Sequence, residues 1–84
     1  MYTQIIRYNR RFYILPVSKG FIAVEDIHVR NGKFISTDKH DVLAYRHTEK
    51  EVINSLIDGL DYQYLRTIKG YTVEQAMKVI YYGG

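Results

Sequence analysis

Cysteine and tryptophan are absent from this 84-residue chain, and proline occurs only once. Without cysteine there can be no disulfide framework and no thiolate site, which is typical of intracellular proteins, so we expect a cytoplasmic location. No long apolar run is present either, because the longest, residues 12–17, is far shorter than the roughly 20 residues that cross a bilayer. Arg7, Arg10 and Arg11 stand where the apolar part of a signal peptide would begin. We therefore expect no membrane partner.

The composition is that of an ordinary globular protein, with 46% hydrophobic and 25% charged residues. Such a balance argues against disorder and against a coiled coil. Two separate cores would leave each half about forty residues, near the lower limit for independent folding, so we predict one domain over residues 1–84. Small chains without cross-links are often stabilised by self-association, and a homodimer is one such arrangement.

Positive charge is concentrated at the beginning of the chain. The overall formal charge is +3, yet residues 1–24 contain four basic side chains and no acidic one. Residues 1–50 carry nine basic and five acidic residues, whereas residues 51–84 carry three and four. The sequence thus combines a basic N-terminal half with a nearly neutral C-terminal half.

The first half of the chain has the pattern of β-strands. Apolar residues flank a polar segment at residues 9–11, which predicts a hairpin with its tip there. Pro16 cannot donate to a ladder and is expected at a strand end or an edge. Asn31-Gly32 separates two apolar segments, residues 27–30 and 33–36, and is the favoured pair for a two-residue hairpin turn. A polar loop over residues 38–41 and a short strand over residues 42–46 follow.

The second half has the pattern of helices. Thr48 and Glu51, and later Thr72 and Gln75, have the spacing of capping boxes that begin a helix. The spacing of apolar residues predicts one helix near residues 49–58, with Gly59 at its end, and another near residues 73–82, ending at Gly83-Gly84. Residues 62–69 fit either a short helix or a strand, and we favour the helix.

Strands followed by helices predict an α+β fold. We expect an antiparallel β-sheet of three to five strands over residues 3–46, followed by two or three C-terminal α-helices that pack on one of its faces. The helix spacing predicts a set of side chains buried against the sheet: Val52, Ile53, Leu56, Ile57, Val73, Met77 and Ile80.

No pattern of catalytic or metal-binding residues is present. Histidines and carboxylates come closest together at Asp38, His40, Asp41 and His47, but the two histidines are separated by a loop and a predicted strand, so solvated loop residues are the better interpretation. His28 is expected to be a half-exposed strand residue. Serines lack the Gly-x-Ser-x-Gly context, and the glycines form no phosphate-binding loop. We therefore expect no enzyme activity, no catalytic residues, no metal and no cofactor.

The segment over residues 7–13 alternates arginines with aromatic rings. Such a surface can contact phosphates and stack on bases, or it can anchor a protein interface, where tyrosine and arginine are enriched. The chain also contains nine tyrosines, and some of them can serve a binding face as well as the core. The candidate partner-binding residues are Arg7, Tyr8, Arg10, Arg11, Tyr13, Lys19, Tyr62 and Tyr64.

A short, cysteine-free, tyrosine-rich domain without catalytic motifs resembles the small accessory proteins of bacteriophages and other mobile elements. That resemblance implies a non-enzymatic binding module that inhibits or modulates a larger host protein or nucleoprotein, as anti-CRISPR proteins do. The alternative is a regulator that binds DNA or RNA directly through the same arginines. A third interpretation is an interaction subunit that self-associates through its C-terminal helix.

Overall fold

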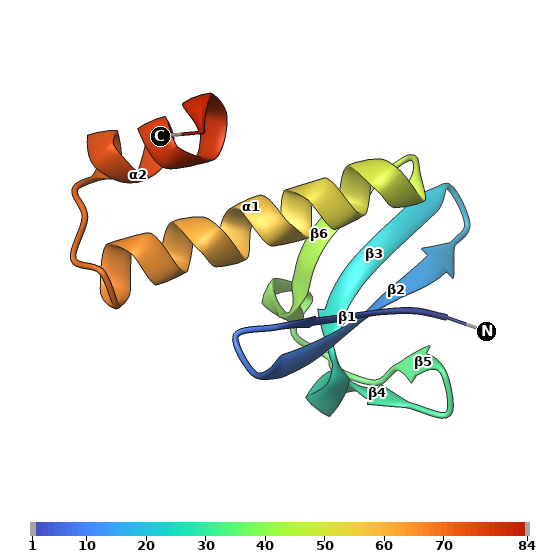
Figure 1. Ribbon diagram of the computed structural model, residues 1–84. Coiled ribbons are helices and arrows are strands. Elements are labelled where there is room, and N and C mark those ends of the chain that lie inside the picture. The colour runs from blue at the N-terminus through green and yellow to red at the C-terminus, as the bar shows by residue number, and fades with distance from the viewer. Residues whose placement is uncertain (1, 84) are drawn as a thin grey trace. The chain divides into compact units, whose positions relative to one another are not determined.

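The computed structural model describes residues 2–83, so Gly84 lies outside the described residues. Its strands are β1 (Thr3–Arg7), β2 (Arg10–Val17), β3 (Gly20–Glu25), β4 (Val29–Arg30), β5 (Lys33–Phe34) and β6 (Val42–Arg46). Two short 3₁₀ helices, η1 (Asp26–His28) and η2 (Lys39–Asp41), interrupt them, and the helices α1 (Glu49–Thr67) and α2 (Val73–Tyr82) follow (Figure 1). The predicted α+β class, with strands first and two helices after them, is confirmed.

Four strands form one antiparallel sheet in the order β1-β2-β3-β6, within the predicted three to five. Three strands that are consecutive in sequence thus lie next to one another, and β6 joins after the excursion over residues 26–41. Pro16 is the penultimate residue of β2 and lies beyond Ile14, the last residue that β1 pairs. Its missing N–H therefore costs the β1–β2 ladder nothing, as expected for a proline near a strand end.

The first hairpin turns at Tyr8 and Asn9, so the turn shares only Asn9 with the predicted tip at residues 9–11. Both residues have positive φ, 51° and 63°, the combination that a two-residue type I′ turn requires. Asparagine tolerates this region because its short side chain can bond locally, whereas a tyrosine there is uncommon. With the turn at this place, Arg10 and Arg11 belong to strand β2 and Arg7 pairs with Arg10.

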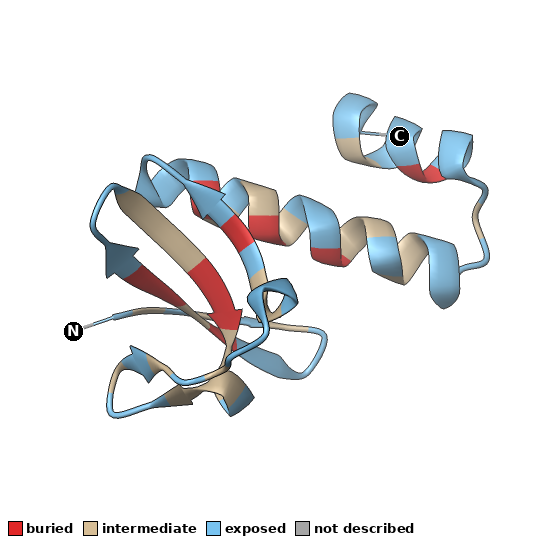
Figure 2. Cartoon of the chain, turned by 180° about the vertical axis from the view of Figure 1, so that it is seen from behind, coloured by how far each residue is buried: buried red, intermediate tan, exposed pale blue. Residues whose placement is uncertain are grey.

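Residues that pair across strands point to the same side of a sheet, so the register shows which side chains share a face. The two faces of this sheet differ in burial. The core face carries Phe12 and Ile14 of β2 with Ala23 and Ala44, and all four are buried. We call the opposite side the open face. It carries Ile6, Arg11, Tyr13, Leu15, Val17, Ile22, Val24 and Tyr45. Only Leu15 and Val24 of this set are buried. Figure 2 shows buried stretches, coloured red, next to exposed ones along the strands.

The excursion between β3 and β6 contains the predicted Asn-Gly hairpin. Asn31 and Gly32 have φ of 53° and 75°, and β4 and β5 on either side form a separate two-stranded sheet. The strands are shorter than predicted, since Ile27 and His28 lie in η1 rather than in a strand. The prediction of a strand position for His28 was therefore wrong, because the chain turns directly after Glu25 to leave the main sheet.

The chain divides into two compact units, residues 1–54 and 55–84. The first contains the sheet, the excursion and the first residues of α1, and the second contains the rest of α1 together with α2. The folding of residues 1–84 as one domain stays a prediction.

Helix α1 begins as predicted but continues beyond Gly59. The hydroxyl of Thr48 accepts from the Glu51 N–H at 3.1 Å and donates to the Glu51 carboxylate at 2.8 Å. In the first unit, Thr3 of β1 donates to the carboxylate of Glu49 at 2.8 Å. The predicted end at Gly59 was wrong, because the apolar spacing continues and Leu60 is buried. Glycine inside a helix costs only about 1 kcal/mol, which such burial offsets.

Residues 62–67, for which helix and strand were both open, are the last turns of this same helix. Tyr71 donates its N–H to the carbonyl of Leu65 at 2.9 Å, and Gly70 adopts a φ of 70° where the helix has ended. None of the helices formed by the described residues combines the length and hydrophobicity that crossing a membrane requires.

Helix α2 starts with the predicted capping box but buries little. Thr72 and Gln75 exchange both bonds of the box, at 2.9 and 3.1 Å. Ala76 is fully buried, whereas Val73 is 51% and Met77 39% exposed, so these two predicted core positions were wrong. Only the Ala76 side of the apolar stripe is covered, and the small alanine leaves its larger neighbours accessible. Of the predicted α1 set, Val52 and Leu56 are buried, and Ile53 and Ile57, like Ile80 of α2, are half-buried.

Candidate binding surface

The predicted partner-binding residues are distributed over both units. Tyr62 and Tyr64 lie half-buried on the part of α1 that belongs to the second unit. The others lie in the first unit: Arg7, Tyr8, Arg10, Arg11, Tyr13 and Lys19. The residues of the first unit form no single basic patch, because the strand register directs their side chains to different faces of the sheet.

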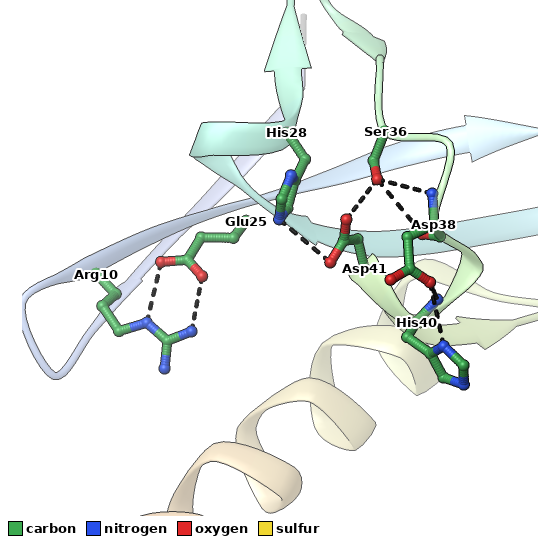
Figure 3. A network of polar contacts seen from close by, with 7 residues as sticks. All are labelled: Arg10, Glu25, His28, Ser36, Asp38, His40 and Asp41. Carbon is green, nitrogen blue, oxygen red and sulfur yellow. Dashed lines mark hydrogen bonds and ion pairs between the residues drawn. The ribbon is translucent and has the colours of Figure 1, made fainter.

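Arg10 is engaged by a carboxylate of the neighbouring strand. Its guanidinium donates from Nε and Nη2 to the two carboxylate oxygens of Glu25, at 3.0 and 2.7 Å (Figure 3). The same guanidinium lies 5.1 Å from the ring centre of Phe12. The hydrogen bond from Arg10 lowers the pKa of Glu25, although partial burial opposes it, and the same bond raises the pKa of Arg10. Arg10 therefore fastens β2 to β3.

The three arginines of residues 7–13 do not gather on one side of the sheet. Arg7 pairs with Arg10, and Arg10 shares the side of Phe12, so both point toward the core face. Arg11 pairs with Ile6 and points to the open face, where it is exposed. The Arg7 guanidinium lies 5.4 Å from the ring centre of Tyr8. The register thus leaves Arg11 as the arginine of the open face.

An apolar groove lies on the open face. Its volume is about 350 Å³, and its floor is formed by Leu15, Val17 and Ile22 of the sheet. Phe34 of β5 and Tyr2 add aromatic rings. The volume falls within the range typical of ligand and side-chain pockets.

The tip of the second hairpin closes one end of this groove. The Tyr2 ring lies so close to Gly32 that a β-carbon there would overlap it. Lys33 is the one charged residue among the described residues that line the groove. Beyond the groove the open face also exposes the side chains of Ile6 and Tyr45, and Val17 within the groove is exposed too. It is therefore an apolar surface bordered by positive charge.

Sequence reasoning missed this surface, although a signal for it exists. Strand β2 is apolar at consecutive positions from Phe12 to Leu15 rather than alternating, which is typical of a strand covered on both faces. The cover on the second face comes from the β4–β5 hairpin, far along the chain, and it is incomplete. Only the three-dimensional arrangement shows which residues it leaves accessible.

The outer edge of β1, which borders the open face, carries backbone groups that no strand within residues 2–83 pairs with. In an antiparallel pair only alternate residues exchange backbone hydrogen bonds, and the pair next to a two-residue turn is a bonded one. Thr3, Ile5 and Arg7 therefore bond to β2, while the N–H and C=O groups of Gln4 and Ile6 point away from the sheet. No other strand of the described residues pairs with this edge.

The polar side chains of the excursion form a network at its base (Figure 3). One oxygen of Asp41 accepts a short hydrogen bond from the Ser36 hydroxyl, and the other lies 3.4 Å from Nε2 of His28. The backbone N–H of Ile35 donates to the carbonyl of His28 at 2.9 Å. The two contacts of Asp41 join both ends of the β4–β5 hairpin to η2, and the Ile35–His28 bond joins these ends to each other.

This network does not have the geometry of a catalytic triad. In a triad the histidine lies between serine and carboxylate and takes the serine proton, whereas here the carboxylate of Asp41 lies between the serine and the histidine. Asp38 and His40 bond to each other at 3.1 Å and are strongly exposed, as predicted for solvated loop residues. Within residues 2–83, no three side chains of histidine, aspartate or glutamate gather in a metal-binding arrangement.

In the second unit, α2 presents large apolar side chains to solvent. Besides Val73 and Met77, its exposed residues include Val79, Tyr81 and Tyr82. They surround most of the helix rather than forming one stripe.

Comparisons with family models, with curated proteins and with solved structures find no match. The fold class is that of a small α+β protein with a four-stranded antiparallel sheet. The chemistry of its own surface is the basis on which its function is inferred.

Proposed function

We propose that this protein is a non-enzymatic binding module that acts stoichiometrically on a larger host protein in the cytoplasm. The observation that carries the proposal is the open face, with its apolar groove and exposed Ile6, Val17 and Tyr45. Covering such side chains is favourable by about 25 cal/mol for each Å² removed from water. Inhibition or modulation of the host protein follows from occupying a surface that it uses itself.

The placement of positive charge favours a protein over a nucleic acid as the partner. Binding to a nucleic acid backbone depends on several simultaneous phosphate contacts. Arg10 is held by Glu25, and Arg7 points to the side opposite Arg11. The residues that floor the groove are aliphatic, which suits apolar side chains of a protein. Direct binding of DNA or RNA remains the alternative, and salt and nuclease distinguish it.

The experiment is capture from bacterial lysate with the immobilised protein, with and without nuclease and over a range of salt. The variant that tests the open face is the double change Ile6→Asp and Val17→Asp. Ile27→Asp is the control, because Ile27 is also exposed but does not line the groove.

We expect a protein in stoichiometric amount that withstands nuclease, is retained by the control and is lost with the double variant. Capture that nuclease abolishes, or that falls steeply with salt, would support the nucleic acid alternative. Capture that the double variant leaves unchanged would exclude the open face, and a change such as Tyr82→Asp on the exposed surface of α2 would be tried next.

A further inference from the structure

We infer that the β1 edge accepts an extended, acidic segment of the partner protein as an additional strand of the sheet. The inference rests on the proposed function and names how the partner docks. Strand addition supplies affinity through main-chain hydrogen bonds and specificity through alternate side chains.

Strand β1 has backbone N–H and C=O groups available for an added strand. Gln4 and Ile6 direct their N–H and C=O groups outward, which provides two donors and two acceptors at the spacing of a β-ladder. An added strand would bond to these two residues and leave the bonds between β1 and β2 intact.

The two edges of the sheet differ in the regularity of their pairing. Edge strands are usually protected from pairing by bulges, proline or lysine. The β6 edge has a register shift where it pairs with β3, between Ala23 and Val24. The register of β1 with β2 is continuous from Thr3 to Arg7, and β1 contains neither proline nor lysine. Of the two edges, β1 is the regular one.

The side chains beside the β1 edge are accessible to an added strand. Gln4 and Ile6 point to the open face, and Ile6 is 62% exposed. Tyr2, two residues before Gln4, contributes to the groove. A strand outside β1 would place alternate side chains next to Ile6 and toward the groove, so apolar residues are expected at those positions of the partner segment.

The surroundings of the β1 edge on the open face are positively charged. No acidic residue occurs in residues 1–24, and Arg11 lies beside Ile6 on the open face. The carboxylate of Glu49 accepts from Thr3, on the side of the core face. An acidic segment would meet opposite charge here, whereas a second copy of β1 would bring another Arg11 close. Charge complementarity therefore favours an acidic partner over self-pairing.

The test uses a display library of random ten-residue peptides, selected on the full-length protein. Gln4→Pro removes one outward N–H without breaking a bond to β2, and Gln4→Ala is the matched control that keeps this N–H. An amide NMR spectrum of each variant reports whether the fold is retained. Should Gln4→Pro fail to fold, N-methylation of alternate amides in the selected peptide interrupts the same bonds from the other side.

We expect enriched peptides that alternate apolar and acidic residues. Their affinity should fall about tenfold with Gln4→Pro or with N-methylation, the effect of roughly one hydrogen bond, and stay unchanged with Gln4→Ala. Arg11→Glu should also weaken them. The inference would be overturned by a lack of enrichment, by enrichment of basic sequences, or by affinity that neither change affects. A dimer that Gln4→Pro converts to monomer would identify a second copy as the occupant instead.

Failure of this inference and failure of the proposed function give different results. If lysate capture depends on Ile6 and Val17 but not on the backbone of Gln4, the partner docks on the open face without adding a strand. If lysate capture does not depend on the open face at all, the proposed function fails, whatever the library yields.

Discussion

The two faces of the sheet in the first unit differ in how completely their apolar side chains are covered. On the core face, Phe12, Ile14, Ala23 and Ala44 are all buried. On the open face, the same strands bury Leu15 and Val24 but expose Ile6 and Val17. One sheet thus uses one side for stability and leaves the other accessible.

The cause of this difference is the kind of cover that each face receives. The excursion that reaches the open face is short, and its hairpin has only two residues in each strand. Polar contacts of Asp41 with Ser36 and His28 hold it at its base. A small hairpin of this kind covers part of a face and leaves a groove.

The largest expected effect comes from the same substitution made on the two faces. Ile14→Ala on the core face should reduce the free energy of unfolding by about 2–5 kcal/mol, because it leaves a cavity. Ile6→Ala on the open face should change it by less than about 0.5 kcal/mol, since Ile6 is mostly exposed. Urea melts of both variants measure this. Equal losses would mean that the faces do not differ as described.

The helices allow a similar comparison. Leu56→Ala in α1 should cost about 2–5 kcal/mol, because Leu56 is buried. Val73→Ala in α2 should be close to neutral, since Val73 is exposed and alanine has the higher helix propensity. Thermal unfolding followed by circular dichroism compares the two. A large loss at Val73 would show that the Val73 side chain makes an apolar contact in the folded state, contrary to its exposure.

A smaller effect is expected at the base of the excursion. Asp41→Ala removes the acceptor that both Ser36 and His28 contact, and should cost about 1–2 kcal/mol. Asp58→Ala is the control, because Asp58 is an exposed aspartate of α1 that lies outside the excursion, and should cost less than half as much. Denaturant melts of the two variants compare them. If Asp41→Ala is neutral, the hairpin is held by its apolar contacts alone.

The smallest effect concerns Arg10 and Glu25, and it depends on pH. Because the hydrogen bond from Arg10 lowers the pKa of Glu25, the pair stabilises the fold above the ordinary value of 4.5. The contribution is lost as the pH falls through the lowered pKa. Glu25→Gln should therefore cost up to about 1 kcal/mol at pH 7, since the pair is partly exposed. Wild type and variant should converge once the pH has fallen below the lowered pKa of Glu25; a difference that persists there would have another origin.

Much of the fold is predictable because its signals are local. Asn31-Gly32 specifies a turn by backbone conformation alone, and Thr72 with Gln75 specifies a helix start by two hydrogen bonds. The end of α1, in contrast, is not determined by a local signal. Gly59 can end a helix or lie within one, and the burial of Leu60 decides between them.

The candidate surface is less predictable, because it depends on register. Arg10 and Glu25 are fifteen residues apart, and only the pairing of Phe12 with Glu25 brings them together. A turn at Tyr8 and Asn9 instead of residues 9–11 decides which arginine points to which face. The groove requires the β4–β5 hairpin to lie over the sheet, which no local pattern states.

The most direct test of the account is amide hydrogen exchange along β1 in the free protein, measured residue by residue by NMR. If β1 is an open edge with the register described, Ile5 and Arg7 should be protected, while Gln4 and Ile6 exchange nearly as fast as in an unfolded chain. Addition of a selected acidic peptide should then protect Gln4 and Ile6. Protection of Gln4 and Ile6 in the free protein would contradict the account, because it would mean that the edge is already paired.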